Sequence, residues 1–144
     1  MACFFYVELA LELLKGKSFE EAVKAAISTF DLMFSDNTER IHFARILNGS
    51  LAQLSENDIY SSGYVIHSLE ACLWCIYDSK SYKEAVLRAV NLGDDTDTTA
   101  AITGGLAGIV FGYESIPISW INTLARKEDI INLCKRFHSK VISK

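Results

Sequence analysis

The sequence has very little proline and no cluster of basic residues. One of its 144 residues is proline and eight are glycine, and no low-complexity stretch or Pro/Ser-rich linker divides the chain, which argues against disorder. Its 14 Lys and Arg are scattered among 18 Asp and Glu, giving a formal net charge of −4. Such a chain offers no electrostatic surface to a nucleic-acid backbone or an anionic membrane. We expect no nucleic-acid partner and no membrane partner.

Targeting signals and long apolar runs are also missing. Residues 1–7 are apolar but carry no basic residue, and Glu8 and Glu12 follow before a signal-peptide core could form. The apolar run ahead of Glu114 falls short of the roughly 20 residues that a membrane-spanning helix needs. We expect residues 1–7 to belong to a core helix, and the protein to be cytoplasmic.

The cysteines do not form a recognisable disulfide or zinc pattern. Cys3, Cys72, Cys75 and Cys134 all lie in apolar, helix-like contexts, which predicts buried, reduced thiols. Cys72 and Cys75 form a single C-x-x-C pair without a second pair. Core packing is therefore favoured over a redox or zinc-binding role.

Apolar residues recur at helical spacing along nearly the whole chain, and no alternating strand pattern is convincing. Ser18-Phe19-Glu20-Glu21 and Ser81-Tyr82-Lys83-Glu84 are predicted capping boxes at two helix starts. Gly16, Gly49 and Gly93 follow predicted helix ends. A half-hydrophobic chain of 144 residues suits one compact domain. We predict a single all-α domain over residues 1–144, with roughly seven to nine helices.

One predicted helix, near residues 98–113, is rich in glycine. Gly104, Gly108 and Gly112 fall at every fourth position and therefore on one face. Each interior glycine costs about 1 kcal/mol relative to alanine. The spacing therefore predicts that another backbone packs very closely against that face.

Acidic and hydroxyl side chains are concentrated just before this helix. Asp94, Asp95 and Asp97 repel one another, so a fold that keeps them together is expected to offer them a cation. Asp95, Asp97 and Thr98 lie at a helix junction, where their oxygens can converge. Oxygen ligands without a nearby His or Cys favour Mg²⁺, Mn²⁺ or Ca²⁺. Helix capping is the alternative, because Asp and Thr are also favoured at helix N-termini.

Other chemistries find little support. An EF-hand is excluded because Thr99, Ala100 and Leu106 stand where it needs a third acidic ligand, a glycine and a glutamate. No Gly-x-Ser-x-Gly elbow and no phosphate-cradling glycine loop occur. The three histidines, at positions 42, 67 and 138, have no metal-ligand spacing, although His67 follows Gly63 by one helical turn and could line the same cleft.

The segment from Asn91 through Gly108, continuing to Gly112 and residues 116–120, resembles the C-terminal signature of the ADP-ribosylglycohydrolase family, which includes dinitrogenase-reductase-activating glycohydrolase. Ser62-Gly63-Tyr64-Val65, with residues 68–71 and 73–75, resembles the loop and helix upstream of that signature. Residues 16–22 are also similar in type, so the likeness covers most of the chain.

The resemblance implies an all-α orthogonal bundle and a binuclear Mg²⁺ or Mn²⁺ centre that binds the distal ribose of an ADP-ribosyl group. It implies that Asp95, Asp97 and Thr98 are metal ligands, with Gly93 and Asp94 just outside them. It also implies that the loop Ser62, Gly63 and Tyr64 approaches the substrate. Tyr64 could stack on the adenine or simply pack on the surface. No residue is predicted to be catalytic.

Two other motifs of the family, Thr-Asp-Asp-Thr and Gly-Asp-x-x-Gly, do not occur here. The resemblance therefore implies a chain that corresponds to roughly the C-terminal half of a family member. With half of the carboxylates absent, metal-assisted hydrolysis of an ADP-ribosyl glycosidic bond would need a complementing N-terminal fragment. The alternative is a non-catalytic ADP-ribose-binding or structural module. Apolar residues of the first helix would be left uncovered, so a homo-oligomer is also expected.

Overall fold

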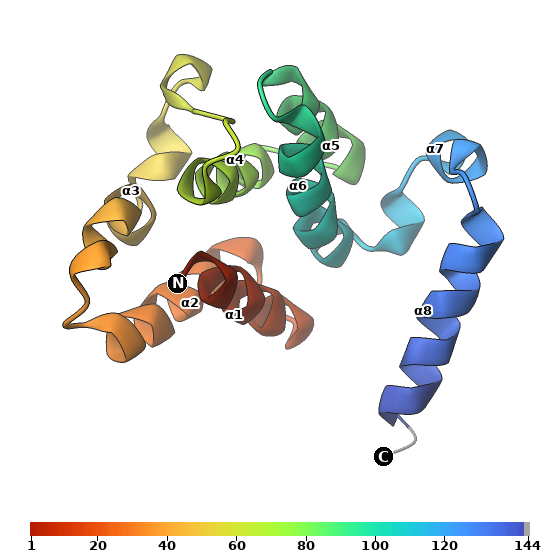
Figure 1. Cartoon of the computed structure of the whole chain (residues 1–144), viewed down its shortest axis with the longest axis horizontal. Helices are drawn as coiled ribbons and strands as arrows, with labels where there is room; N and C mark the ends of the chain where they lie inside the picture. The colour runs from red at the N-terminus through yellow and green to blue at the C-terminus, as the bar shows by residue number, and fades with distance from the viewer. Residues whose placement is uncertain (143–144) are drawn as a thin grey trace.

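The computed structural model describes residues 1–142 and shows an all-α fold, as predicted, with no strand in this part of the chain (Figure 1). The α-helices are α1 (Ala2–Leu14), α2 (Phe19–Phe34), α3 (Ala44–Leu47), α4 (Val65–Tyr77), α5 (Tyr82–Asn91), α6 (Thr96–Phe111), α7 (Ile118–Thr123) and α8 (Lys127–Ile142). Short 3-10 helices occupy Thr38–Phe43, Ser50–Gln53, Glu56–Asp58 and Tyr113–Ser115. None of the helices in residues 1–142 combines the length and apolar character that crossing a membrane requires.

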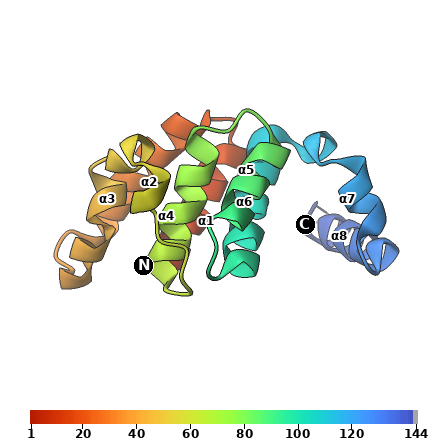
Figure 2. The same cartoon turned by 90° about the horizontal axis from the view of Figure 1, so that it is seen from above.

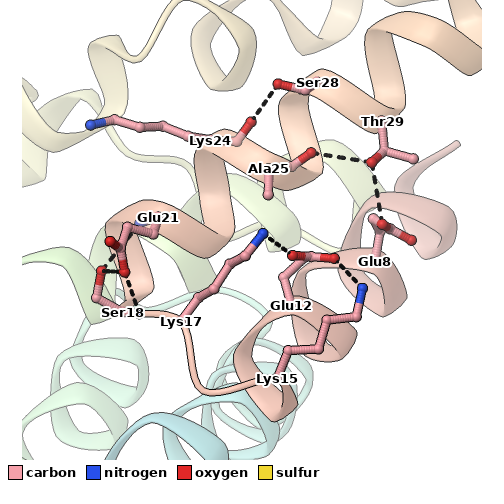
Figure 3. A network of polar contacts seen from close by, with 10 residues as sticks. All are labelled: Glu8, Glu12, Lys15, Lys17, Ser18, Glu21, Lys24, Ala25, Ser28 and Thr29. Carbon is pink, nitrogen blue, oxygen red and sulfur yellow. Dashed lines mark hydrogen bonds and ion pairs between the residues drawn. The ribbon is translucent and has the colours of Figure 1, made fainter.

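The helix starts follow the capping signals in the sequence. Ser18 caps α2 with a complete capping box, because its hydroxyl accepts the Glu21 amide and the Glu21 carboxylate accepts the Ser18 amide (Figure 3). Ser81 caps α5 by accepting the Glu84 amide. The Glu84 carboxylate does not complete the second box, since it accepts the Lys80 amide instead, at 2.8 Å.

The core lies where α4 packs against α1, α5 and α6. These helices lie side by side in Figure 2, and α2 closes the far side of α1. Phe5 of α1 meets Phe30 of α2 edge to face, with ring centroids 5.9 Å apart. Leu73 of α4 and Leu106 of α6 are fully buried. Ten of the 13 residues of α4 are buried, so the helix that begins directly after Tyr64 is held firmly in place.

The cysteine prediction is half right. Cys72 and Cys75 are buried free thiols of α4, and burial raises the pKa of each to about 12. Cys3 and Cys134 are free but exposed, because the helix faces that carry them are not covered by other described residues.

The expectation for the glycine stripe is wrong. No backbone approaches Gly104, where an added Cβ would meet the Tyr82 hydroxyl at 3.1 Å. An added Cβ at Gly108 would have no neighbour within 4 Å, and Gly112 lies beyond the end of α6 with φ +82°. The close approach occurs at Gly105, where a Cβ would lie 2.5 Å from the Tyr6 hydroxyl of α1.

Candidate functional site

The acidic segment forms a tight turn between α5 and α6. Gly93 and Asp94 both adopt left-handed backbone conformations, with φ +85° and +51°. Glycine accepts this conformation freely, and Asp is one of the few other residues that tolerate it. Asp95 follows at the N-cap of α6, whereas Asp97 and Thr98 belong to its first turn. The helix therefore starts two residues earlier than the sequence predicts, and its first turn presents two of the three predicted ligands.

Asp95 stands at the capping position without capping the helix. Its side chain makes no capping hydrogen bond. It lies within hydrogen-bonding reach of the Asp97 side chain, and this contact, together with the amides of Thr98 and Asp97, holds the pKa of the Asp97 carboxyl below its usual value. Asp97 therefore interacts with the helix amides, as the capping alternative supposes, and the Asp95 carboxylate, which does not cap the helix, lies beside the Asp97 carboxylate.

The loop before α4 packs directly against this acidic turn. The buried Ser61 donates its hydroxyl to the Gly93 carbonyl at 2.8 Å, and the Asp95 amide donates to the Ser61 carbonyl at 3.1 Å. An added Cβ at Gly63 would lie 3.1 Å from Asp95 Oδ2. The structure thus brings the predicted substrate loop and the predicted metal ligands together, although they are about thirty residues apart.

Ser61 is a positioning residue that the sequence reasoning missed. The only signal was a hydroxyl directly ahead of Ser62 and Gly63. Nothing in its spacing indicates that it reaches a carbonyl 32 residues along the chain.

His67, in the first turn of α4, organises the rest of the loop. Its Nδ1 lies 2.8 Å from the Ser62 hydroxyl. Its ring lies against Tyr60 and edge to face with Tyr64, with centroid distances of 5.0 Å and 5.1 Å. Both tyrosines remain about half exposed. Tyr64 is therefore oriented by His67 and still presents ring surface to solvent. Tyr60 was not predicted as part of this cluster.

The donor set matches part of a hard-cation site. Asp95 and Asp97 supply carboxylate oxygens and Thr98 supplies an exposed hydroxyl, which is the donor chemistry that Mg²⁺ and Mn²⁺ prefer. Within residues 1–142, no group of three or more His, Cys, Asp and Glu side chains is placed to hold a metal ion. The residues fit such an ion as two or three of its ligands, with the remainder left to water, substrate or another polypeptide.

An apolar cavity of about 420 Å³ lies next to this site but contains none of its residues. It opens between α1, α4 and α6 and is lined by side chains such as Tyr6, Val65 and Ile102. Because it offers almost no polar group, we assign the chemistry to the acidic turn and the loop at residues 61–64.

Comparison with known proteins identifies a family and several relatives. The model of the family described as ADP-ribosylglycohydrolase matches residues 1–144. The chain is 42% identical over 88 residues to the ADP-ribosylarginine hydrolase Tri1 of Serratia proteamaculans (strain 568), which covers 61% of this chain and 24% of that protein. It is 38% identical over 92 residues to the ADP-ribosylarginine hydrolase Tri1 of Pseudomonas putida (strain GB-1), covering 64% and 25%.

A third relative is the ADP-ribosyl-(dinitrogen reductase) glycohydrolase of Rhodospirillum rubrum. It is 34% identical over 67 residues, which cover 46% of this chain and 23% of that protein. The chain thus spans about a quarter of the length of the curated relatives that it matches.

Proposed function

Because the chain belongs to the ADP-ribosylglycohydrolase family, we propose that it supplies part of an active site that hydrolyses an ADP-ribosyl glycosidic bond. Asp95, Asp97 and Thr98 are the proposed ligands of Mg²⁺ or Mn²⁺. The loop of Ser62, Gly63 and Tyr64 is the proposed contact to the ADP-ribosyl group. One observation supports this most directly: Asp95 lies at the start of α6 without capping it, and its Oδ2 faces Gly63.

The proposed ligand is the part that the relatives' names share. Two of them are named for ADP-ribosylarginine and one for ADP-ribosylated dinitrogen reductase. The acceptors differ, whereas the ADP-ribosyl group is common. We therefore propose an ADP-ribosyl group as the ligand of this chain and leave the acceptor unassigned.

The chain's own residues have distinct tasks in this proposal. Ser61 ties the loop to the Gly93 carbonyl, which fixes the distance between loop and acidic turn. Gly63 leaves room beside Asp95 because it has no side chain. Tyr64 presents an exposed ring on which an adenine can stack. A divalent ion, when bound, orients ribose hydroxyls and a water molecule and stabilises developing charge.

The described residues do not complete the site, so the proposal includes a second component. Only two carboxylates converge at the turn, and the relatives are about four times longer than the matched segment. We propose that hydrolysis requires a complementing N-terminal fragment that brings the remaining carboxylates. Because only two carboxylates converge, a second candidate function is a module that binds ADP-ribose without cleaving it.

Calorimetric titration with Mg²⁺ or Mn²⁺ and ADP-ribose tests the proposed binding. We expect heat from the wild-type chain, and its loss in Asp95→Asn and Asp97→Asn. The matched control is Asp94→Asn, which removes the same charge from the same turn and keeps a residue that tolerates φ +51°. Equal heats from all four proteins would remove the assignment.

A second measurement separates the hydrolase from the binding module. The chain is mixed with an N-terminal fragment of a family member that carries the Thr-Asp-Asp-Thr motif, and ADP-ribose release from ADP-ribosylarginine is followed. Release that requires both polypeptides and Asp97 supports the hydrolase. Binding without release in any mixture supports the module.

A further inference from the structure

The segment between α3 and α4 leads into the loop at residues 61–64 (Figure 1). Side chains hold two carbonyl groups of this segment. Trp74 Nε1 donates to the Leu54 carbonyl at 2.9 Å, and Arg45 Nη2 donates to the Asp58 carbonyl at 2.8 Å. Trp74 belongs to α4 and Arg45 to α3, so the segment is held from both of the helices that flank it.

Arg45 also reaches α4. Its Nη1 lies 3.3 Å from Oε2 of Glu70, a buried carboxylate of that helix. Burial raises the pKa of the Glu70 carboxyl, although the Arg45 guanidinium acts in the opposite direction. A buried carboxylate is costly without a partner, and Arg45 supplies one. Two nitrogens of one planar guanidinium thus connect the Asp58 carbonyl to the Glu70 carboxylate.

Asp58 belongs to a short turn that closes on itself. Its carboxylate accepts the Ser55 hydroxyl at 2.6 Å and the Ser55 amide at 3.3 Å. The Asp58 amide in turn donates to the Ser55 carbonyl at 3.0 Å. Ile59, the next residue along the chain, is buried. The bond from Arg45 therefore fixes a hydrogen-bonded turn and the chain that leaves it.

The loop that follows this turn is tied to α4 at both ends. Only three residue steps separate Asp58 from Ser61, which bonds to the acidic turn. An extended chain covers at most about 3.6 Å per residue, so Asp58 keeps Ser61 within about 11 Å. After Tyr64 the chain enters α4, the helix that carries Glu70. One end of the loop is therefore tied to α4 through Arg45, and the other end continues directly into this helix.

We propose that Arg45 and Glu70 are positioning residues, which hold the loop at residues 61–64 against the acidic turn and ready for its ligand. They act through the Asp58 carbonyl. This inference deepens the proposed function and rests on it, because the loop is the proposed contact to the ADP-ribosyl group. The affinity of a ligand falls with the fraction of chains in which its binding conformation is in place.

Amide hydrogen exchange, followed by NMR on the whole chain, tests the positioning directly. The Asp95 amide donates to the Ser61 carbonyl, so its exchange reports whether the loop is in place. The amide of Leu73, which is fully buried in α4, reports unfolding of the core. We expect Arg45→Lys and Glu70→Gln to speed exchange at Asp95, relative to Leu73, by at least about 10-fold, the effect of losing one hydrogen bond to a charged group.

These variants avoid leaving a buried charge unpaired. Arg45→Lys keeps a positive charge beside Glu70 but offers one nitrogen in place of the two that make the contacts. In Glu70→Gln the Arg45 side chain, which is 32% exposed, can turn to solvent. The matched control is Arg40→Lys, because the Arg40 side chain is 30% exposed and pairs with Asp31 of α2. It should leave exchange at Asp95 unchanged.

Calorimetric titration with ADP-ribose and Mg²⁺ tests the consequence for the ligand. We expect Arg45→Lys and Glu70→Gln to raise the dissociation constant by at least about 3-fold, and Arg40→Lys to leave it unchanged. If the wild-type chain binds and both variants bind equally tightly, the proposal is overturned and the proposed function stands.

The exchange rates separate a local role from a structural one. Equal acceleration at Asp95 and Leu73 would show that Arg45 and Glu70 serve only overall stability, and it overturns the proposal. Unchanged exchange at Asp95 overturns it as well. A wild-type chain that binds no ADP-ribose contradicts the proposed function, and the exchange rates then still decide whether this pair holds the loop.

Discussion

Gly63 lies against the Asp95 carboxylate, so that an added Cβ would sit 3.1 Å from Oδ2. Few real Cβ atoms make so short a contact, so the neighbouring group has to move. Here that group is the carboxylate of Asp95, the proposed metal ligand. Gly63→Ala is therefore expected to displace the Asp95 carboxylate and to weaken Mg²⁺-dependent ADP-ribose binding about 10-fold, which equals about 1.4 kcal/mol. Calorimetric titration measures this change.

The control for this prediction is Gly108→Ala in α6, where an added Cβ has no neighbour within 4 Å. It should leave ADP-ribose affinity unchanged. If Gly63→Ala bound as tightly as Gly108→Ala, the position of the Asp95 carboxylate would not matter to the ligand, and the proposed site would lose its main support.

The contact between Ser62 and His67 leads to a second prediction. Their hydrogen bond spans 2.8 Å and ties the loop to the first turn of α4. Ser62→Ala and His67→Phe each remove one partner, while phenylalanine keeps a ring against Tyr64. A double-mutant cycle on urea unfolding should give a coupling of about 0.5–1.5 kcal/mol, the net value of one hydrogen bond.

The same variants report on the orientation of Tyr64. If His67 positions the loop for ADP-ribose, His67→Phe should lower the affinity for ADP-ribose. The affinity is measured at a temperature where the wild-type and variant chains are both folded, so that unfolding cannot explain the change. Additive effects of Ser62→Ala and His67→Phe on unfolding would contradict the coupling, and unchanged affinity would contradict the positioning role.

Local patterns predicted the helices and the acidic segment, but not how the segments meet. Capping residues such as Ser18 and Ser81 mark helix starts because they act within one turn. The bond from Ser61 to Gly93 joins residues 32 positions apart, and no periodicity encodes such a pairing. The metal-ligand role of Asp95, Asp97 and Thr98 was inferred from their spacing and from a resemblance, and it remains a prediction.

The glycines of α6 show the same limit. A spacing of four residues predicts that Gly104, Gly108 and Gly112 share a face, yet it says nothing about what lies opposite them. The close approach at Gly105 is made by the Tyr6 hydroxyl, which donates to the Ile102 carbonyl at 3.0 Å. Only the packing of α1 on α6 reveals it.

This packing predicts that alanine substitutions at two glycines of α6 change the stability of the fold in opposite directions. A Cβ at Gly105 would lie 2.5 Å from the Tyr6 hydroxyl, so Gly105→Ala should destabilise the fold by about 1–3 kcal/mol, the usual cost of overpacking. Gly108→Ala meets open space and should stabilise it by up to about 1 kcal/mol through helix propensity. Urea unfolding followed by circular dichroism gives both values.

Tyr6→Phe provides the check on this explanation, because it removes the hydroxyl that an alanine at position 105 would strike. The double variant Tyr6→Phe/Gly105→Ala should recover part of the stability that Gly105→Ala loses. Destabilisation of equal size in both backgrounds would place the cause outside the contact between α1 and α6.

Glu12 makes the stability of the first two helices depend on pH. Its side chain is almost fully buried and pairs with Lys15 and Lys17 at the turn between α1 and α2 (Figure 3). Hydrogen bonds from Lys15 and then Lys17 lower the pKa of Glu12 from its usual 4.5. The ion pairs of Glu12 therefore stabilise the fold fully above pH 4.5. This stabilisation is lost as the pH falls through the lower pKa that Glu12 has in the folded chain.

The urea midpoint of the wild-type chain should consequently decrease when the pH is lowered from 5 to 3. Glu12→Gln should be less stable than wild type at pH 5. Its midpoint should decrease less, because glutamine has no proton to gain at this position. The exposed Glu20→Gln serves as the matched control and should follow the wild-type curve. Since Glu21 also has a lowered pKa, from its bonds with Ser18, some pH dependence should remain in Glu12→Gln. Parallel curves for wild type and Glu12→Gln would show that the two lysines bind this carboxylate no better in the folded chain than in the unfolded one.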